Sequence, residues 1–289
     1  MSKSADLDIE QKEFAEKEKG FFFDEKEHAY FFDGKPLMGI TSVLSVISKP
    51  ALIQWAANEA IKYIESVAGS AQVDGYLRLL PEHLEQARTA HRKKKEDAAE
   101  KGTDLHALIE EYVTESIERN GGKPLSANVI SGKYEPISRF IVWAIAEQIT
   151  FLEAEKRLYS KELWIAGTCD LVFQKDGKTY IGDIKTYKKL WDRVPMLQCA
   201  GYGLMWEEMQ AVPLYEAKLK QFSEIFHAEE AEGHARIHAR HEGPKIDGYC
   251  VIRIKDGEFE TKWSYDVEGD RAGFLAALTL YRTLQNWAA

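Results

Sequence analysis

The spacing of apolar residues along this chain predicts strands in three separate regions. Residues 21–41, FFFDEKEHAYFFDGKPLMGIT, alternate aromatic runs with Asp-Glu-Lys-Glu and Asp-Gly-Lys, a pattern typical of two or three short antiparallel strands. Residues 156–185 are β-like, with a hairpin turn at Asp176-Gly177. Two further strands, 247–254 and 259–264, are predicted on either side of Lys255-Asp256-Gly257.

The regions between these strands have helical periodicity. Pro81 to Glu118 is predicted helical but broken near Gly102-Thr103, where Thr103 is expected to cap a second helix with an apolar stripe. The other helices are predicted from Thr41-Ser42 through Trp55 to about Val67, at 136–154, from Pro195 to about Gln210, and at 268–286. This order predicts an α/β fold in which a central mixed β-sheet is flanked by helices.

The chain is expected to fold as a single domain after a charged N-terminal tail at residues 1–19. We divide the domain, residues 20–289, into an N-terminal hairpin with helices at 20–155, a second hairpin with its following helix at 156–215, a polar insertion at 221–245, and C-terminal strands with a helix at 246–289. The chain has no apolar run of membrane-spanning length and no apolar signal core, and its three cysteines form no disulfide framework. We therefore expect a cytoplasmic protein without membrane contact.

The net charge of −9 limits the partners that the chain can bind by bulk electrostatics. Proteins that coat nucleic acids are usually basic, so any phosphate binding here must be local, through a basic patch or a bound cation. Metal ligands are themselves acids, and the charge is therefore compatible with phosphate binding through a bound cation.

Chemistry concentrates on the predicted hairpin, Gly167 to Lys185. If Asp176-Gly177 forms a two-residue turn, the numbers of paired residues sum to 353, which places Asp170 directly opposite Asp183. Lys185 lies two residues beyond Asp183 and is expected on the same face, with Ile184 on the other face and its carbonyl near the site. A longer, bulged turn would shift this register.

Opposed carboxylates destabilise a sheet unless a cation lies between them. Mg²⁺ or Mn²⁺, bound through carboxylate oxygens and water, meets this need, and a neighbouring lysine can orient water or stabilise charge on a phosphate. The alternative is that both aspartates are solvent-exposed strand residues and Lys185 is a surface charge.

The sequence GTCDLV, a hairpin turn and IGDIKT together resemble the active site of the PD-(D/E)XK nuclease superfamily. Asp170, Asp183 and Lys185 match its two acids and its lysine. The resemblance implies a restriction-endonuclease-like core with an N-terminal β-hairpin and helical elaboration. It also implies hydrolysis of phosphodiester bonds by a metal-activated water.

Three further segments resemble the RecB-like exonuclease branch of that superfamily. KGTDLHALIEE is similar to its helix motif, which implies that His106 is a metal ligand. Glu110, four residues later on the same helix face, is either the acid that orients the imidazole or a surface acid. Gln198 and Tyr202 match a glutamine–tyrosine pair that places DNA near the metal. FDEKEHAYFFDGKPLMGITSVL is similar to the N-terminal hairpin and helix of phage and bacterial members.

The cofactors and partners expected from this reading are Mg²⁺ or Mn²⁺ and DNA ends, single- or double-stranded. Three cysteines cannot hold the four-cysteine iron–sulfur cluster of some members, and no G-x-x-x-x-G-K-[ST] motif for ATP is present. A homo-oligomer, or a recombination or helicase partner, stays open. Lys188, with Lys189 and Arg193, is expected to contact phosphate. The basic run at 91–95 is interpreted as a solvated helix face. The histidines at 227–241 have no cysteine or other obvious third ligand near them in the sequence and are not expected to form a zinc site.

The function expected is that of a Mg²⁺/Mn²⁺-dependent deoxyribonuclease, more readily an exonuclease than an endonuclease, in DNA repair or recombination. The site comprises Asp170, Asp183 and Lys185 for catalysis, His106, Asp170, Asp183 and Ile184 for metal, and Gln198, Tyr202 and Lys188 for substrate. Two rivals stay open: a non-catalytic DNA-binding or assembly module on the same fold, and a restriction-type endonuclease.

Overall fold

The computed structural model describes residues 20–47, 50–68, 72–73, 76–77, 79–125, 132–186, 193–225, 227–255 and 257–288. The predicted tail at 1–19 and the predicted phosphate contacts Lys188 and Lys189 lie outside the described residues. Within them, no helix combines the length and apolar character that crossing a membrane requires.

A six-stranded mixed β-sheet forms the centre of the molecule, as the sequence predicted. Its order is β11-β10-β9-β8-β4, and β7 pairs with β8 on the opposite edge. The β9–β10 and β4–β8 pairs are parallel, and the others are antiparallel. The strands are β4 (Met38–Gly39), β7 (Thr150–Ser160), β8 (Ile165–Lys175), β9 (Lys178–Lys185), β10 (Gly248–Lys255) and β11 (Glu258–Ser264).

The β8–β9 hairpin has the predicted register. Lys175 pairs with Lys178, and the ladder continues to Leu171 opposite Gly182, so that paired numbers sum to 353 throughout. Asp176 and Gly177 have φ values of 52° and 75°, as a type I′ turn requires. Glycine tolerates this backbone without strain and aspartate is among the residues that accept it most readily, which explains why this dipeptide sets the register.

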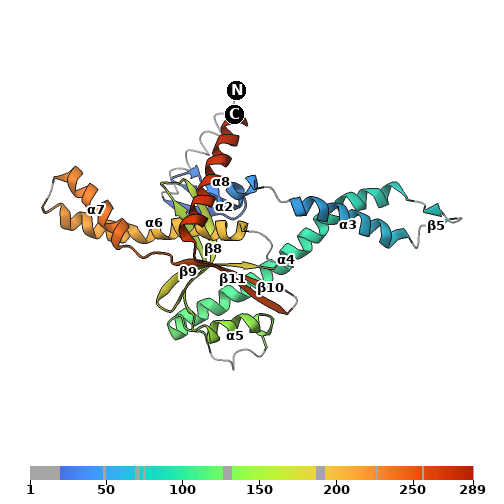
Figure 1. Ribbon diagram of the computed structural model, residues 1–289, viewed down its shortest axis with the longest axis horizontal. Helices are drawn as coiled ribbons and strands as arrows, with labels where there is room; N and C mark the ends of the chain where they lie inside the picture. The colour runs from blue at the N-terminus through green and yellow to red at the C-terminus, as the bar shows by residue number, and fades with distance from the viewer. Residues whose placement is uncertain are drawn as a thin grey trace, which may run out of the picture.

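Helices cover both faces of the sheet (Figure 1). On one face, Val172 and Ile181 pack with α6 (Val194–Phe222) and α8 (Val267–Ala288) around Met205 and Phe274. On the other face, buried residues of β8, β9 and β10 pack against α4 (Pro81–Asn120) and α5 (Ser138–Ala146), which follows the short helix η3 (Glu135–Ile137). The two apolar layers bury most residues of β8, β9 and β10, whereas alternate residues of β11 are exposed.

The N-terminal strands form a separate small sheet of β1 (Phe21–Asp24), β2 (Ala29–Phe32) and β3 (Lys35–Pro36). The chain then joins the central sheet through β4 and turns into α2 (Ile40–Val43) and η1 (Leu44–Val46). The first helix thus begins after Gly39, not at a Thr41-Ser42 cap, and Ile40 and Val43 are buried in the core.

The prediction of a break at Gly102-Thr103 is wrong, because α4 is continuous over 40 residues. Gly102 is buried, and a Cβ there would lie 3.0 Å from Thr186 Oγ1, just after β9. Glycine costs a helix about 1 kcal/mol relative to alanine. Here it lets α4 pass close to the end of β9, and so the residue that resembled a helix break serves as a contact point.

The prediction of a helix over 136–154 is also wrong in its second half. Helix α5 ends at Ala146, and Gln148 has a φ of 51°, a left-handed conformation that a helix cannot continue through. The chain enters β7 at Thr150, where β-branched and aromatic residues favour a strand.

Helix α6 continues to Phe222, beyond the predicted end near Gln210, and contains Pro213. The predicted polar insertion contains a helix, α7 (Ala228–Glu242), that packs back on α6. Ala231, Ala235 and Ala239 recur every four residues and are buried, so α7 presents a small-residue face while its polar residues remain in solvent.

A helical arm projects from the sheet on the other side of the molecule (Figure 1). It consists of α3 (Pro50–Ala68) and the first half of α4, with the short strands β5 (Gln72–Val73) and β6 (Tyr76–Leu77) between them. The second half of α4 belongs to the core, so one helix joins the arm to the sheet.

Candidate metal centre

The candidate site lies where the sheet splits. The edge of β8 pairs with β9 from Lys175 to Leu171 and with β4 at Ile165 and Ala166. Asp170 stands between these two ladders. Its Oδ2 accepts a hydrogen bond of 2.6 Å from the backbone N–H of Ile184, which takes the place of the next strand-to-strand bond. Because the two ladders separate here, the Asp170 side chain is buried between them. One carboxylate oxygen accepts the hydrogen bond from the Ile184 N–H, and the second oxygen is left for another partner.

Three potential ligands converge at this point. Single donor atoms of His106, Glu155 and Asp170 all lie within 4.8 Å of one another. His106 Nδ1 is 3.3 Å from Glu155 Oε1 and 3.9 Å from Asp170 Oδ2. One imidazole with two carboxylates suits Mn²⁺, and the oxygen donors suit Mg²⁺. The sequence predicted that His106 and Asp170 lie close together, and the structure places them so.

Glu155 is the site residue that the sequence reading missed. It lies opposite Asp170, between the pairs Ala154–Leu171 and Lys156–Cys169, and has a φ of 44°. A left-handed glutamate within a strand is strained, and such strain concentrates at functional sites. The alternation of acids at Glu153 and Glu155 is a sequence signal for it, but Glu155 falls between the predicted helix at 136–154 and the predicted β region at 156–185.

The acid that contacts His106 is Glu155, and the predicted partner Glu110 is exposed on α4. Metal-bound histidines are usually oriented by an acid or a carbonyl. Glu155 holds the imidazole at Nδ1 in this structure and is also close enough to be a ligand itself.

Asp183 lies beside this trio and is fully buried. Lys185 Nζ approaches Asp183 Oδ2 to 2.5 Å, so the two side chains share a face as predicted. Apart from this ion pair with Lys185, neither carboxylate oxygen of Asp183 has a hydrogen-bond partner within the described residues. A buried carboxylate without directional partners is costly, and a cation at this position would satisfy it. The donor set therefore fits a divalent metal.

The Ile184 side chain is part of the hydrophobic core. It packs in the α4–α5 core, on the face opposite to Asp183 and Lys185, as the strand alternation predicted. Its backbone N–H positions Asp170, and the use of its carbonyl as a metal ligand remains a prediction.

The electrostatics of the site reflect burial and crowding of acids. Burial, and secondly the charge of Asp183, raise the pKa of Asp170 to about 7. Burial likewise raises the pKa of Asp183, against the opposing attraction of Lys185. Although burial alone would lower it, the pKa of Lys185 is raised by the charges of Asp183 and Asp170. The lysine is therefore held as an ammonium next to two acids that favour a cation.

Gln198 and Tyr202 lie together on α6 and contact the same region. Gln198 Nε2 donates to the Tyr202 hydroxyl at 2.9 Å, and the tyrosine is buried. Burial, and then the charges of Asp170 and Asp183, raise the pKa of Tyr202 well above its ordinary value. A Cβ at Gly167 would lie 2.8 Å from the ring, so this glycine makes room for the phenol.

The other predicted contacts are placed less directly. Arg193 caps the start of α6 and forms a 2.7 Å ion pair with Asp270, although its side chain is 65% exposed. His238 pairs with Glu242, and the rings of His234 and His238 contact Phe222. Within the described residues, the only group of three metal-binding side chains is the one at His106.

Comparison with known proteins adds no identification. The chain matches no model of a known protein family, and no characterised protein matches it. The site is therefore interpreted from its own geometry.

Proposed function

We propose that this chain is a divalent-metal-dependent deoxyribonuclease of the PD-(D/E)XK type, most akin to RecB-like exonucleases. The observation that supports it best is the convergence of Glu155, Asp170 and Asp183 with Lys185 where the sheet splits, with His106 approaching from α4. Acids from three adjacent strands, an imidazole and an ammonium form a site suited to a phosphodiester.

Each side chain has a role that follows from its position. His106, Glu155, Asp170 and Asp183 would hold Mg²⁺ or Mn²⁺. The bound ion supplies a lowered pKa for water and positive charge for the phosphate. Lys185, kept protonated by its acidic neighbours, orients a water or stabilises charge that develops on the phosphate oxygens.

Gln198 and Tyr202 are proposed to place the nucleic acid strand. The phenol stays neutral at ordinary pH because burial and the neighbouring carboxylates oppose its ionisation. A neutral hydroxyl and a primary amide can both donate to phosphate oxygens. The Gln198–Tyr202 hydrogen bond fixes the orientation of both groups before substrate binds.

The proposal is tested by digesting end-labelled linear and circular DNA, single- and double-stranded, with Mn²⁺, Mg²⁺ or EDTA. We expect metal-dependent cleavage that requires ends. Asp183→Asn and Lys185→Ala should abolish it, whereas Asp104→Asn, at an exposed position of α4, should not. Circular dichroism establishes that each variant is folded.

The digest also separates the rival functions. Cleavage of circular DNA would favour an endonuclease. Binding of DNA without turnover in Mn²⁺ would indicate a scaffold module, and full activity in EDTA would refute the metal-dependent mechanism.

A further inference from the structure

Helix α4 carries a row of basic residues on the same face as His106. Arg88, Arg92 and Lys95 precede His106 by 18, 14 and 11 residues. In a helix with 3.6 residues per turn, these separations are close to five, four and three whole turns. Because α4 is continuous from Pro81 to Asn120, the three side chains point in about the same direction as the metal-site imidazole. We call Arg88, Arg92 and Lys95 the basic stripe.

The basic stripe is open to solvent. Arg88 is 78% exposed and contacts Glu85 at 3.3 Å, an exposed pair of little energetic weight. Arg92 and Lys95 are exposed, and within the described part of the chain neither has an ion pair. These two cations are therefore without an ion pair to any described side chain, in a protein whose net charge is −9.

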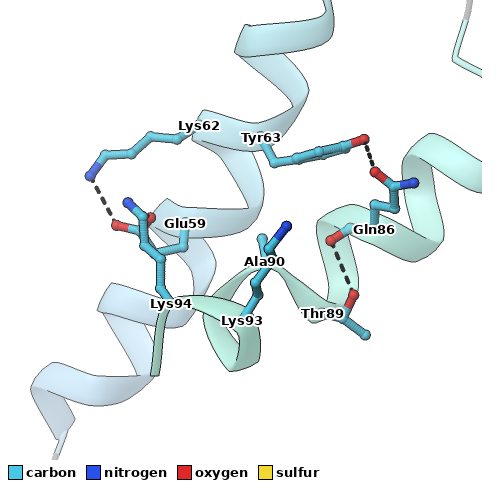
Figure 2. A pocket seen from close by; sticks show the side chains of 8 residues that line it. All are labelled: Glu59, Lys62, Tyr63, Gln86, Thr89, Ala90, Lys93 and Lys94. Atoms are coloured by element: carbon cyan, nitrogen blue, oxygen red, sulfur yellow. Dashed lines mark hydrogen bonds and ion pairs between the residues drawn. The ribbon is translucent and has the colours of Figure 1, made fainter. Parts of the chain in front are cut away.

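The packing of α3 against α4 leaves the basic stripe uncovered. Helix α3 packs on a different side of α4, where Ala87 is buried and the rings of Trp55 and His91 meet edge to face. Between the two helices lies the pocket of Figure 2, in which buried Glu59 binds both Lys62 and Lys94.

A second contact in that pocket joins the helices further out. The Tyr63 hydroxyl donates to Gln86 across the same interface (Figure 2). These contacts fasten α3 to α4, and the stripe remains on the uncovered side.

The distances match the dimensions of DNA. A rise of 1.5 Å per residue puts Lys95, Arg92 and Arg88 roughly 16, 21 and 27 Å along the helix from His106. Since base pairs in DNA are about 3.4 Å apart, a strand that follows α4 from the metal site would meet the stripe about five to eight nucleotides away.

We propose that the basic stripe binds the phosphates of the DNA strand about five to eight nucleotides from the bond that is cut. The inference rests on the proposed nuclease function, and it names the part of the molecule that retains the substrate. It also gives an acidic protein a local row of positive charge that leads to the site and can attract a polyanion.

The test compares two triple variants with equal charge change. Arg88→Gln, Arg92→Gln and Lys95→Gln remove the stripe, while Lys35→Gln, Lys178→Gln and Lys262→Gln remove three exposed lysines on other elements. Both variants change the formal net charge from −9 to −12, because each loses three positive charges. Circular dichroism checks the helicity of each.

Binding is measured in EDTA by fluorescence anisotropy on labelled single strands and blunt duplexes of about 30 nucleotides, a length well beyond the stripe. The stripe variant should bind about 10- to 100-fold more weakly at ~0.1 M salt, and the slope of log affinity against log salt should fall by about 2 to 3 in magnitude. The control variant should bind like the wild type. The preferred probe shows whether the stripe follows a single strand or a duplex.

Cleavage in Mn²⁺ separates this inference from the proposed function. The stripe variant should cleave long DNA more slowly but a strand of about four nucleotides, too short to reach the stripe, at the wild-type rate. If the wild type cleaves DNA and the stripe variant binds and cleaves long DNA as the control does, the stripe inference is wrong and the nuclease function stands. If the stripe governs binding but no protein cleaves, the nuclease function falls and the binding surface stands.

Discussion

Replacing Asp170 with asparagine should stabilise the protein when no divalent metal is present. Asp170 is buried beside Asp183, and its pKa is raised from 3.8 to about 7. Asparagine keeps the size of the side chain and an oxygen that can accept the hydrogen bond from the Ile184 N–H. The substitution therefore removes the charge and leaves the local hydrogen bond in place.

The magnitude follows from the shift in pKa. The folded state binds the Asp170 proton more tightly than the unfolded state does. The stability that this proton contributes is therefore fully present below the unfolded pKa of about 3.8, and it is lost as the pH rises through the folded pKa of about 7. At 1.36 kcal/mol per pKa unit, this loss approaches about 4 kcal/mol at about pH 8. Asp170→Asn should recover up to that amount at about pH 8 and less than about 1 kcal/mol at about pH 4.

The assay is urea denaturation of both proteins in EDTA across this pH range, with Asp104→Asn as an exposed control that changes stability little at any pH. In Mn²⁺ at 100 times its dissociation constant, the wild type should gain about 2.7 kcal/mol, and the Asn variant, which lacks one ligand, should gain less. Two outcomes would refute the argument that burial and the neighbouring acid destabilise the ionised Asp170. One is an Asn variant less stable than the wild type at about pH 8 in EDTA, and the other is a difference in stability that does not depend on pH.

The remaining predictions address the ligands, the phenol and the fold. Glu155→Gln should weaken Mn²⁺ binding at least about 10-fold, measured by thermal shift against Mn²⁺, whereas Glu110→Gln should leave it unchanged because Glu110 is exposed. Tyr202→Phe should lower kcat/KM on DNA at least about 10-fold with a stability change of roughly 1 kcal/mol, since it removes one buried hydrogen bond; an unchanged kcat/KM would assign the tyrosine to packing alone. Gly122→Ala should cost more than about 2 kcal/mol of unfolding free energy, because its φ is 83° and a Cβ would lie 2.2 Å from the Phe151 carbonyl oxygen. Gly177→Ala, with a φ of 75° and open space around it, should cost only about 1 kcal/mol, and equal losses at the two glycines would contradict the steric argument.

The parts of the structure that could be predicted from the sequence are those with local causes. A two-residue turn sets the register of its hairpin, so Asp176-Gly177 was sufficient to predict the ladder as far as Leu171 opposite Gly182. Asp170 and Asp183 are the next residue on each strand, just beyond the last ladder pair. The alternation of a strand then placed Lys185 beside Asp183 and Ile184 in the opposite core.

The parts that could not be predicted depend on contacts between distant segments. Glu155 reaches the site through an irregularity of β7, in which the register shifts near Glu153 and the backbone of Glu155 turns left-handed. No local pattern specifies such a conformation; it persists because the paired strands on both sides hold it. Glu155, although it is much closer to Asp170 in the sequence than His106 is, is therefore the site residue that sequence spacing could not supply.

Gly102 is a second example of a feature that local sequence patterns do not predict. By propensity alone a glycine weakens a helix, and the sequence therefore predicted two helices. In the structure, its missing side chain allows α4 to pass Thr186 at the end of β9, and the helix remains continuous. That continuity keeps His106 in phase with Arg92 and Lys95, so a residue that appears to divide the helix instead links the arm to the metal centre.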